Sequence, residues 1–131
     1  MKQIIKKILK EQVSDKVITK VLLQLNQGKI KPPYFKNLDL IGLTEEEIKT
    51  VLQMFTNGNV NMGDRTVRNS GGYILYHETS DGYWVEGEYD ERGNETYFED
   101  SDGYWRKKGY DKNNVLIYHE NSIYGIILDK R

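Results

Sequence analysis

The fold is decided by residues 76 to 117, YHETSDGYWVEGEYDERGNETYFEDSDGYWRKKGYDKNNVLI, which read twice through one unit of 21 residues. Nine of the 21 positions are identical in the two copies, and a third copy begins at Tyr118 before the pattern is lost after Ser122. An atypical terminal unit is expected of a repeat array. Half a copy also lies upstream, where residues 69–72 align with residues 90–93. The chain is therefore organised around a tandem repeat.

Each unit contains two turn signals separated by short runs of alternating polar and apolar residues. The first is an Asp-Gly pair, at Asp81-Gly82 and again at Asp102-Gly103. This pair favours a tight two-residue hairpin turn with positive φ at both central residues. The second signal ends at Gly93, and the next copy has Asn114 there, the usual substitute where the backbone is left-handed. Consecutive hairpins predict an antiparallel meander of about six strands from residue 63 onward.

The first part of the chain, residues 1–58, is helical in character. Apolar residues recur at helical spacing from Ile4 to Leu9 and again from Val17 to Leu25, with Leu23 off the stripe, and Gly28 would end the second helix. The prolines of residues 31–34 then predict an extended link.

A further helix is predicted from a capping box at Thr44 and Glu47, with three acidic residues near the positive end of the helix dipole. Its buried stripe runs from Ile48 to Phe55, and Asn57-Gly58 supplies its stop. The helix start accounts for the acidic run, which we do not interpret as a metal or acid-base cluster.

These patterns predict an α+β protein with a helical region at residues 1–58 and a β-hairpin repeat region at residues 59–131. Each part alone buries too little apolar surface to form a stable domain by itself. We therefore expect the helices to pack on one face of the sheet, near the most apolar strand candidate, residues 123–128, which would otherwise be a sticky edge.

Composition excludes several classes of protein. The 131 residues include 19 basic and 20 acidic ones, for a net charge of −1, which gives no general argument for nucleic acid or a membrane. No cysteine is present, so disulfides and thiolate chemistry are excluded and a reducing compartment fits. No apolar run approaches the length of a transmembrane helix, and we expect a cytoplasmic protein.

Strand alternation, combined with two-residue turns, predicts the faces of the sheet. One face would be a tyrosine ladder, and Trp84, Phe98 and Trp105 would lie on the other face with His77, Glu86 and Lys107. Same-face aromatic neighbours stabilise a thin sheet, and an exposed ladder would also suit binding, because Tyr is enriched at interfaces. Both interpretations stay open. The candidate binding surface is Tyr76, Tyr83, Tyr89, Tyr97, Tyr104, Arg106, Tyr110 and Tyr118.

Other chemical signals are weak, and we predict no catalytic residue, no cofactor and no metal site. His77 and His119 are aligned in the repeat with Phe98 between them, as at a packing position. Residues 100–103 resemble part of a calcium-binding loop, but the other ligands are not found at the required spacing. A hairpin turn explains these residues. Residues 106–108 form a short basic spot beside Trp105, offset by nearby glutamates.

A family resemblance rests on Tyr89-Asp90-Glu91-Arg92-Gly93-Asn94 and the following Tyr97, which look like the tyrosine-aspartate repeat of RHS-type proteins. The longer string Tyr-x-Glu-x-Ser-Asp-Gly-Tyr-Trp resembles tandem repeats in small phage and bacterial proteins. The resemblance covers residues 73–122 and departs from the family at Asn114-Val115. It implies a β-repeat surface in a phage-related setting, in the bacterial host cytoplasm or a virion, and it carries no activity.

Three function hypotheses follow. The leading one is a non-enzymatic protein-binding module, a phage accessory or host-directed factor acting through an aromatic sheet face. The second is a virion or other assembly component that self-associates through the sheet. The third is single-stranded nucleic-acid binding by aromatic stacking.

Overall fold

The computed structural model of the protein describes residues 15–131 and confirms the α+β fold, with helices first and an antiparallel meander after them. The chain divides into two compact units, which meet in the sequence between Asn57 and Gly58. The helix predicted between Ile4 and Leu9 lies outside the described residues.

The helical unit follows its apolar spacing. Residues 15–26 are helical, with Val21 and Leu25 buried and Leu23 exposed, as the stripe predicts. Gly28 follows at φ +71, the left-handed conformation that commonly ends a helix.

Helix α2, Tyr34–Leu40, is a correction, because an extended link was predicted to run through Tyr34 and no helix was expected after it. Phe35 and Leu38 are buried one turn apart, so residues directly after Pro33 use a short amphipathic turn to fill the core. Proline restricts the residue before it and leaves the residue after it free to be helical.

Helix α3, Glu45–Thr56, confirms the capping box. The Thr44 hydroxyl accepts the Glu47 amide at 3.1 Å, and the Thr44 amide donates to the Glu47 carboxylate at 2.9 Å. The buried residues are Ile48, Val51 and Leu52. Asn57 ends the helix at φ 57.

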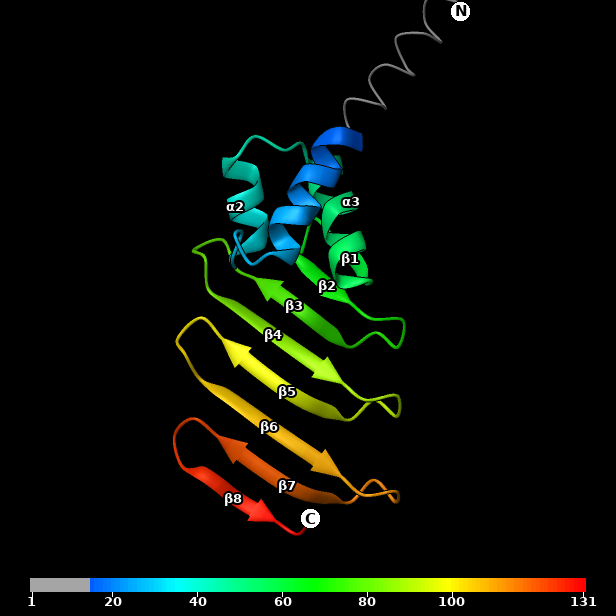
Figure 1. The fold of residues 1–131 in the computed structure, drawn as a ribbon, viewed down its shortest axis with the longest axis vertical. Coiled ribbons are helices and arrows are strands. Elements are labelled where there is room, and N and C mark those ends of the chain that lie inside the picture. The colour runs from blue at the N-terminus through cyan, green and yellow to red at the C-terminus, as the bar shows by residue number, and fades with distance from the viewer. Residues whose placement is uncertain (1–14) are drawn as a thin grey trace, which may run out of the picture. The chain divides into compact units, whose positions relative to one another are not determined.

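The second unit is one antiparallel sheet in which the eight strands lie side by side in chain order (Figure 1). About six strands were predicted, and the two short strands β1 and β2 account for the difference. The strands are β1 Asn59–Asn61, β2 Thr66–Arg68, β3 Ile74–Glu78, β4 Trp84–Tyr89, β5 Glu95–Asp100, β6 Trp105–Tyr110, β7 Leu116–Asn121 and β8 Gly125–Asp129.

The Asp-Gly turns lie where they were predicted, but they are of a different turn type. Between β3 and β4 the Thr79 amide donates to the Tyr83 carbonyl at 2.8 Å, and the Gly82 amide donates back to Thr79 at 3.1 Å. The loop therefore holds three residues, 80–82, and only Gly82 has positive φ, at 94. This is the three-residue hairpin loop with a left-handed glycine. Gly103 repeats it at φ 90.

The turns at the other end of the strands confirm the half copy of the repeat that was predicted upstream. Asn69, Asp90 and Asp111 start the three turns, and each side-chain oxygen Oδ1 accepts the backbone amides two and four residues later. Gly93 and Asn114 occupy the aligned position at φ 85 and 66, so the left-handed conformation predicted for Asn114 is confirmed.

Serine residues fasten one hairpin to the next. The Ser101 amide donates to the Trp84 carbonyl at 3.0 Å, and the Trp84 amide donates to the Ser101 hydroxyl at 3.2 Å. The same reciprocal pair joins Ser122 to Trp105, at 3.0 and 3.1 Å. The register across the strands is thus fixed at the same point in each repeat.

The predicted tyrosine ladder is wrong, because the third loop residue reverses the side-chain alternation across each Asp-Gly turn. Glu78 lies opposite Trp84, and Tyr76 lies opposite Glu86, so these residues share one face. Tyr83 lies on the other face, where its hydroxyl donates to Asp100. A shift of one residue moves every side chain of a strand to the opposite face.

Each face therefore carries part of the predicted ladder. We call one the tryptophan face and the other the arginine face. The tryptophan face carries Tyr76, Glu78, Trp84, Glu86, Glu88, Tyr97, Glu99, Trp105, Lys107, Tyr118 and Glu120. The arginine face carries Tyr73, His77, Tyr83, Val85, Tyr89, Glu95, Phe98, Tyr104, Arg106, Lys108, Tyr110 and His119.

Candidate binding surface

Three tyrosines recur on the tryptophan face on alternate strands, and each is held by the same hydrogen bond. The hydroxyls of Tyr76, Tyr97 and Tyr118 donate to the glutamate two residues later, at 2.6, 3.1 and 2.6 Å. Residues two apart on a strand lie on one face. Each ring is therefore fixed beside a carboxylate.

Burial on the tryptophan face falls along the sheet. Tyr76 is 2% exposed and Glu78 is 1% exposed, so Tyr76, one of the predicted surface residues, cannot offer a contact. From β4 onward the residues of this face are half-buried or exposed. The accessible part of the face therefore begins at Trp84 and includes Tyr97, Trp105 and Tyr118.

Carboxylates dominate the charge of this accessible part. Glu86 lies directly opposite Glu99 in the β4–β5 ladder, and Glu88 lies opposite Tyr97. The pKa of Tyr97 is raised by burial, by its hydrogen bond to Glu99, and by the negative charges around it. A phenol whose ionisation is opposed in this way stays neutral and keeps donating its hydrogen bond.

Cations of the chain itself lie over two rings of the face. The Lys107 ammonium is 5.2 Å from the centroid of Trp105, and the Arg131 guanidinium is 3.9 Å from that of Tyr118. Both distances fall within the range at which an aromatic ring attracts a cation. The face thus combines aromatic rings with carboxylates, a chemistry suited to positive charge.

The arginine face is organised by an internal ion pair. Arg106 contacts Glu95 through two hydrogen bonds of 2.6 and 2.7 Å, and Lys108 lies 3.7 Å from the same carboxylate. Burial opposes ionisation of Glu95, but Arg106 outweighs it, so the pKa of Glu95 is lowered. Arg106 also lies 4.2 Å over the Phe98 ring. The guanidinium predicted to face a partner is therefore engaged within the sheet.

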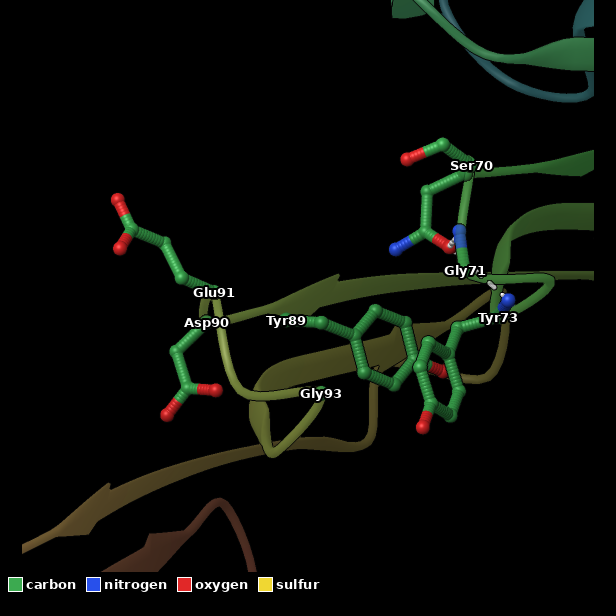
Figure 2. Close-up of a pocket in the computed structure, with 8 residues that line it drawn as sticks. Ser70, Gly71, Tyr73, Tyr89, Asp90, Glu91 and Gly93 are labelled. Carbon is green, nitrogen blue, oxygen red and sulfur yellow. Dashed lines mark hydrogen bonds between the residues drawn. The ribbon is translucent and has the colours of Figure 1, made fainter.

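A hollow of about 330 Å³ lies between the turn that joins β2 to β3 and the turn that joins β4 to β5. Figure 2 shows the Tyr73 and Tyr89 rings facing each other there, and their centroids are 5.0 Å apart. A Cβ on Gly93 would lie 2.7 Å from the Tyr73 hydroxyl. Tyr73 was not among the residues predicted from the sequence. The signal that could have found it is its alignment with Asn94, because an aromatic residue stands there at a turn position of the repeat.

The weaker sequence signals have structural roles. His77 Nδ1 lies 2.9 Å from the Thr66 hydroxyl. Asp100 accepts the Asp102 and Tyr104 amides, which is the turn chemistry expected of residues 100–103. Within residues 15–131 no group of three or more potential metal ligands comes together, and no helix in this range could cross a membrane.

His119, which is aligned with His77 in the repeat, has no such contact at one of its ring nitrogens. Its Nε2 atom is buried and has no hydrogen-bond partner among the described residues.

Comparison with known proteins adds no relative: no protein-family model matches the chain, and no curated protein is significantly similar to it. The geometry of the sheet is therefore the basis for assigning a function.

Proposed function

We propose that this protein is a non-enzymatic protein-binding module that acts through the accessible part of its tryptophan face. The observation that carries the proposal is the set of recurring rings on a hydrogen-bonded sheet, Trp84, Tyr97, Trp105 and Tyr118. Rigid aromatic side chains supply contact area at low entropic cost, and Trp and Tyr dominate the energetics of interfaces. The RHS-type resemblance favours a phage accessory or host-directed role in the bacterial cytoplasm or a virion.

The test compares two tyrosines of the same unit on opposite faces. Tyr97 is on the tryptophan face and Tyr104 is on the arginine face, and both are half-buried. Proteins captured by the wild-type chain from a bacterial lysate are compared with those captured by Tyr97→Ala and by Tyr104→Ala. We expect one captured protein to be lost with Tyr97→Ala and kept with Tyr104→Ala, a loss of roughly 2 kcal/mol in binding.

Thermal unfolding of both variants is the control, because the comparison requires that both remain folded. Equal capture by the two variants, or loss with Tyr104→Ala alone, would contradict the assignment to the tryptophan face.

Self-association through the sheet is a second candidate, favoured by the last hairpin. Ile126 and Ile127 of β8 are 57% and 52% exposed, and Ile123 and Tyr124 in the adjoining turn are exposed as well. In the described sheet β8 has one neighbour, β7. Exposed apolar edge strands pair readily with other chains. Light scattering across a concentration series should then show larger species, and Ile127→Lys should abolish them.

Single-stranded nucleic-acid binding receives the least support. Its chemistry is a positively charged groove lined by aromatic rings, whereas Glu86, Glu88 and Glu99 surround the rings of the tryptophan face. An oligonucleotide that bound tightly at low salt, and was released as salt rose, would favour this function instead.

A further inference from the structure

The end of the repeat array is more apolar than the copies before it. Three polar positions of the second copy are occupied by apolar residues one period later. These positions are Asp102, Arg106 and Lys107, and they become Ile123, Ile127 and Leu128. The terminal units of repeat proteins carry a polar outer face, because no further unit covers them. This array shows the opposite pattern, so its last strand has the composition of a strand that is covered.

The structure leaves this apolar strand exposed at the end of the sheet. In the described sheet β8 has β7 on one side and no strand on the other (Figure 1). Tyr124 is 77% exposed and Ile123 is 67% exposed in the turn before β8, and both isoleucines of the strand are exposed as well. An edge strand also presents a row of unpaired backbone donors and acceptors. The free side of β8 is therefore suited to receive another strand.

The other edge of the sheet is protected. The strand there is β1, Asn59–Asn61, which has only three residues. Val60 is buried and the two asparagines beside it are exposed. A short, polar edge strand offers little for pairing. In the described sheet each chain thus has one apolar edge, and two chains that joined these edges would form a closed assembly of two.

Charge selects the direction in which two β8 strands would pair. The charged residues of this segment, residues 129–131, all lie at its C-terminal end. In a parallel pair each of them would lie opposite its own copy, and like charges directly opposite one another destabilise a sheet. In an antiparallel pair centred on Ile127, apolar residues meet at the centre and Lys130 lies opposite Tyr124 of the other copy. An aromatic ring attracts a cation at such a distance, so the antiparallel arrangement is complementary.

We infer that two copies of this chain pair antiparallel through β8, about a two-fold axis beside Ile127, and form one continuous sheet from the eight strands of each copy. This inference rests on the second candidate function, self-association through the last hairpin. It adds the number of chains, their orientation and the surface that they form together.

The pairing joins the tryptophan faces of the two copies. Residues directly opposite one another on neighbouring strands lie on the same face. Ile126 lies opposite Glu120, so it belongs to the tryptophan face, and antiparallel pairing keeps this face on one side of the combined sheet. The two Trp105 residues are then five strand spacings apart, about 24 Å across the strands. A partner that contacts both copies gains from the effective concentration of the second contact.

Analytical ultracentrifugation of the full chain over a concentration series tests the number of chains. We expect one species of twice the 15.4 kDa chain mass and none larger. Ile127→Lys should weaken dimerisation by at least about tenfold, because two lysines would meet on the axis. Met54→Lys is the matched control, since Met54 lies on α3 and is 58% exposed, and it should have no effect. A monomer at every concentration, a larger species, or equal effects of the two substitutions would overturn the inference.

Single cysteines test the orientation, because the chain has no cysteine of its own. Ile127→Cys should form a disulfide between copies on oxidation, since this position lies on the axis. Lys130→Cys should not, because the two substituted positions would be separated by the six residues from 124 to 130. That separation is about 20 Å, which is beyond the reach of a disulfide. A Lys130→Cys chain that cross-linked to its own copy would indicate parallel strands and would overturn the inference.

A mixture of two variants keeps the orientation testable if Ile127→Cys itself weakens the pairing. Tyr124→Cys and Lys130→Cys lie opposite each other in the inferred dimer, so a mixture of the two chains should give the mixed disulfide. Absence of the mixed disulfide in a sample that sediments as a dimer would also overturn the inference.

Failure here is distinct from failure of the proposed function. If the chain assembles into species other than this dimer, self-association stands and the inferred geometry is wrong. If the dimer forms while Tyr97→Ala and Tyr104→Ala capture the same proteins, the dimer stands without the binding function of the tryptophan face.

Discussion

Replacing Gly93 by alanine should destabilise the sheet more than the same change at Gly103. Both residues lie in turns with positive φ, 85 and 90, so both replacements carry a left-handed strain of about 1–2 kcal/mol. At Gly103 the added Cβ meets nothing within 4 Å. At Gly93 it would lie 2.7 Å from the Tyr73 hydroxyl and 3.0 Å from two ring carbons.

The Tyr73 ring must therefore move in the Gly93→Ala variant, and its stacking on Tyr89 is lost. An aromatic pair of this kind contributes about 0.5–1.5 kcal/mol. We expect Gly93→Ala to cost about 2–3 kcal/mol in the free energy of unfolding, against about 1–2 kcal/mol for Gly103→Ala. Urea unfolding followed by tryptophan fluorescence measures the difference, because both tryptophans lie in the sheet.

A double-mutant cycle isolates the contact. In a Tyr73→Ala background, the two glycine replacements should cost the same, because the ring that distinguishes them is gone. Equal costs in the wild-type background would refute the reasoning, since the hollow would then accommodate a methyl group without moving Tyr73.

Two further predictions concern an ion pair and a helix start. The lowered pKa of Glu95 means that its contribution to stability is present above the pKa of the unfolded chain and is lost as pH falls through the folded value. Glu95→Gln should therefore flatten the loss of stability between roughly pH 5 and pH 3, measured by urea unfolding at each pH, and an unchanged acid limb would count against the pair with Arg106. Thr44→Ala should cost about 1 kcal/mol in the helical unit, because the capping box is removed. Far-ultraviolet circular dichroism during unfolding would measure this, with Thr50→Ser as a control that keeps the hydroxyl bonded to Glu46.

Local signals with a single physical outcome were predictable from the sequence. Thr44 and Glu47 can satisfy each other's amides in one way, and the structure contains that box. Asn114 in place of Gly93 indicated a left-handed turn residue, and its φ is 66. The meander followed from the spacing of these turns, because each hairpin is a local structure.

The faces of the sheet were not predictable from the same signals. An Asp-Gly pair fits a two-residue loop and also a three-residue loop ending in glycine. The two differ by one residue, and that residue decides whether Tyr83 or Trp84 shares a face with Tyr76. The candidate surface was therefore mixed: Tyr97 and Tyr118 belong with the tryptophans, and Tyr83, Tyr89, Tyr104 and Tyr110 belong with Arg106.

The reciprocal bonds of Ser101 with Trp84, and of Ser122 with Trp105, determine how such a chain can change in length. Inserting or deleting one residue between a serine and its tryptophan would break both bonds of the clamp and exchange the faces of every later strand. Adding a complete unit of 21 residues would preserve each clamp, and it would add a tryptophan and a tyrosine to the tryptophan face and two tyrosines to the arginine face. Duplication can therefore lengthen this sheet only by whole repeat units, so aromatic rings would be added in fixed sets while their spacing stayed constant.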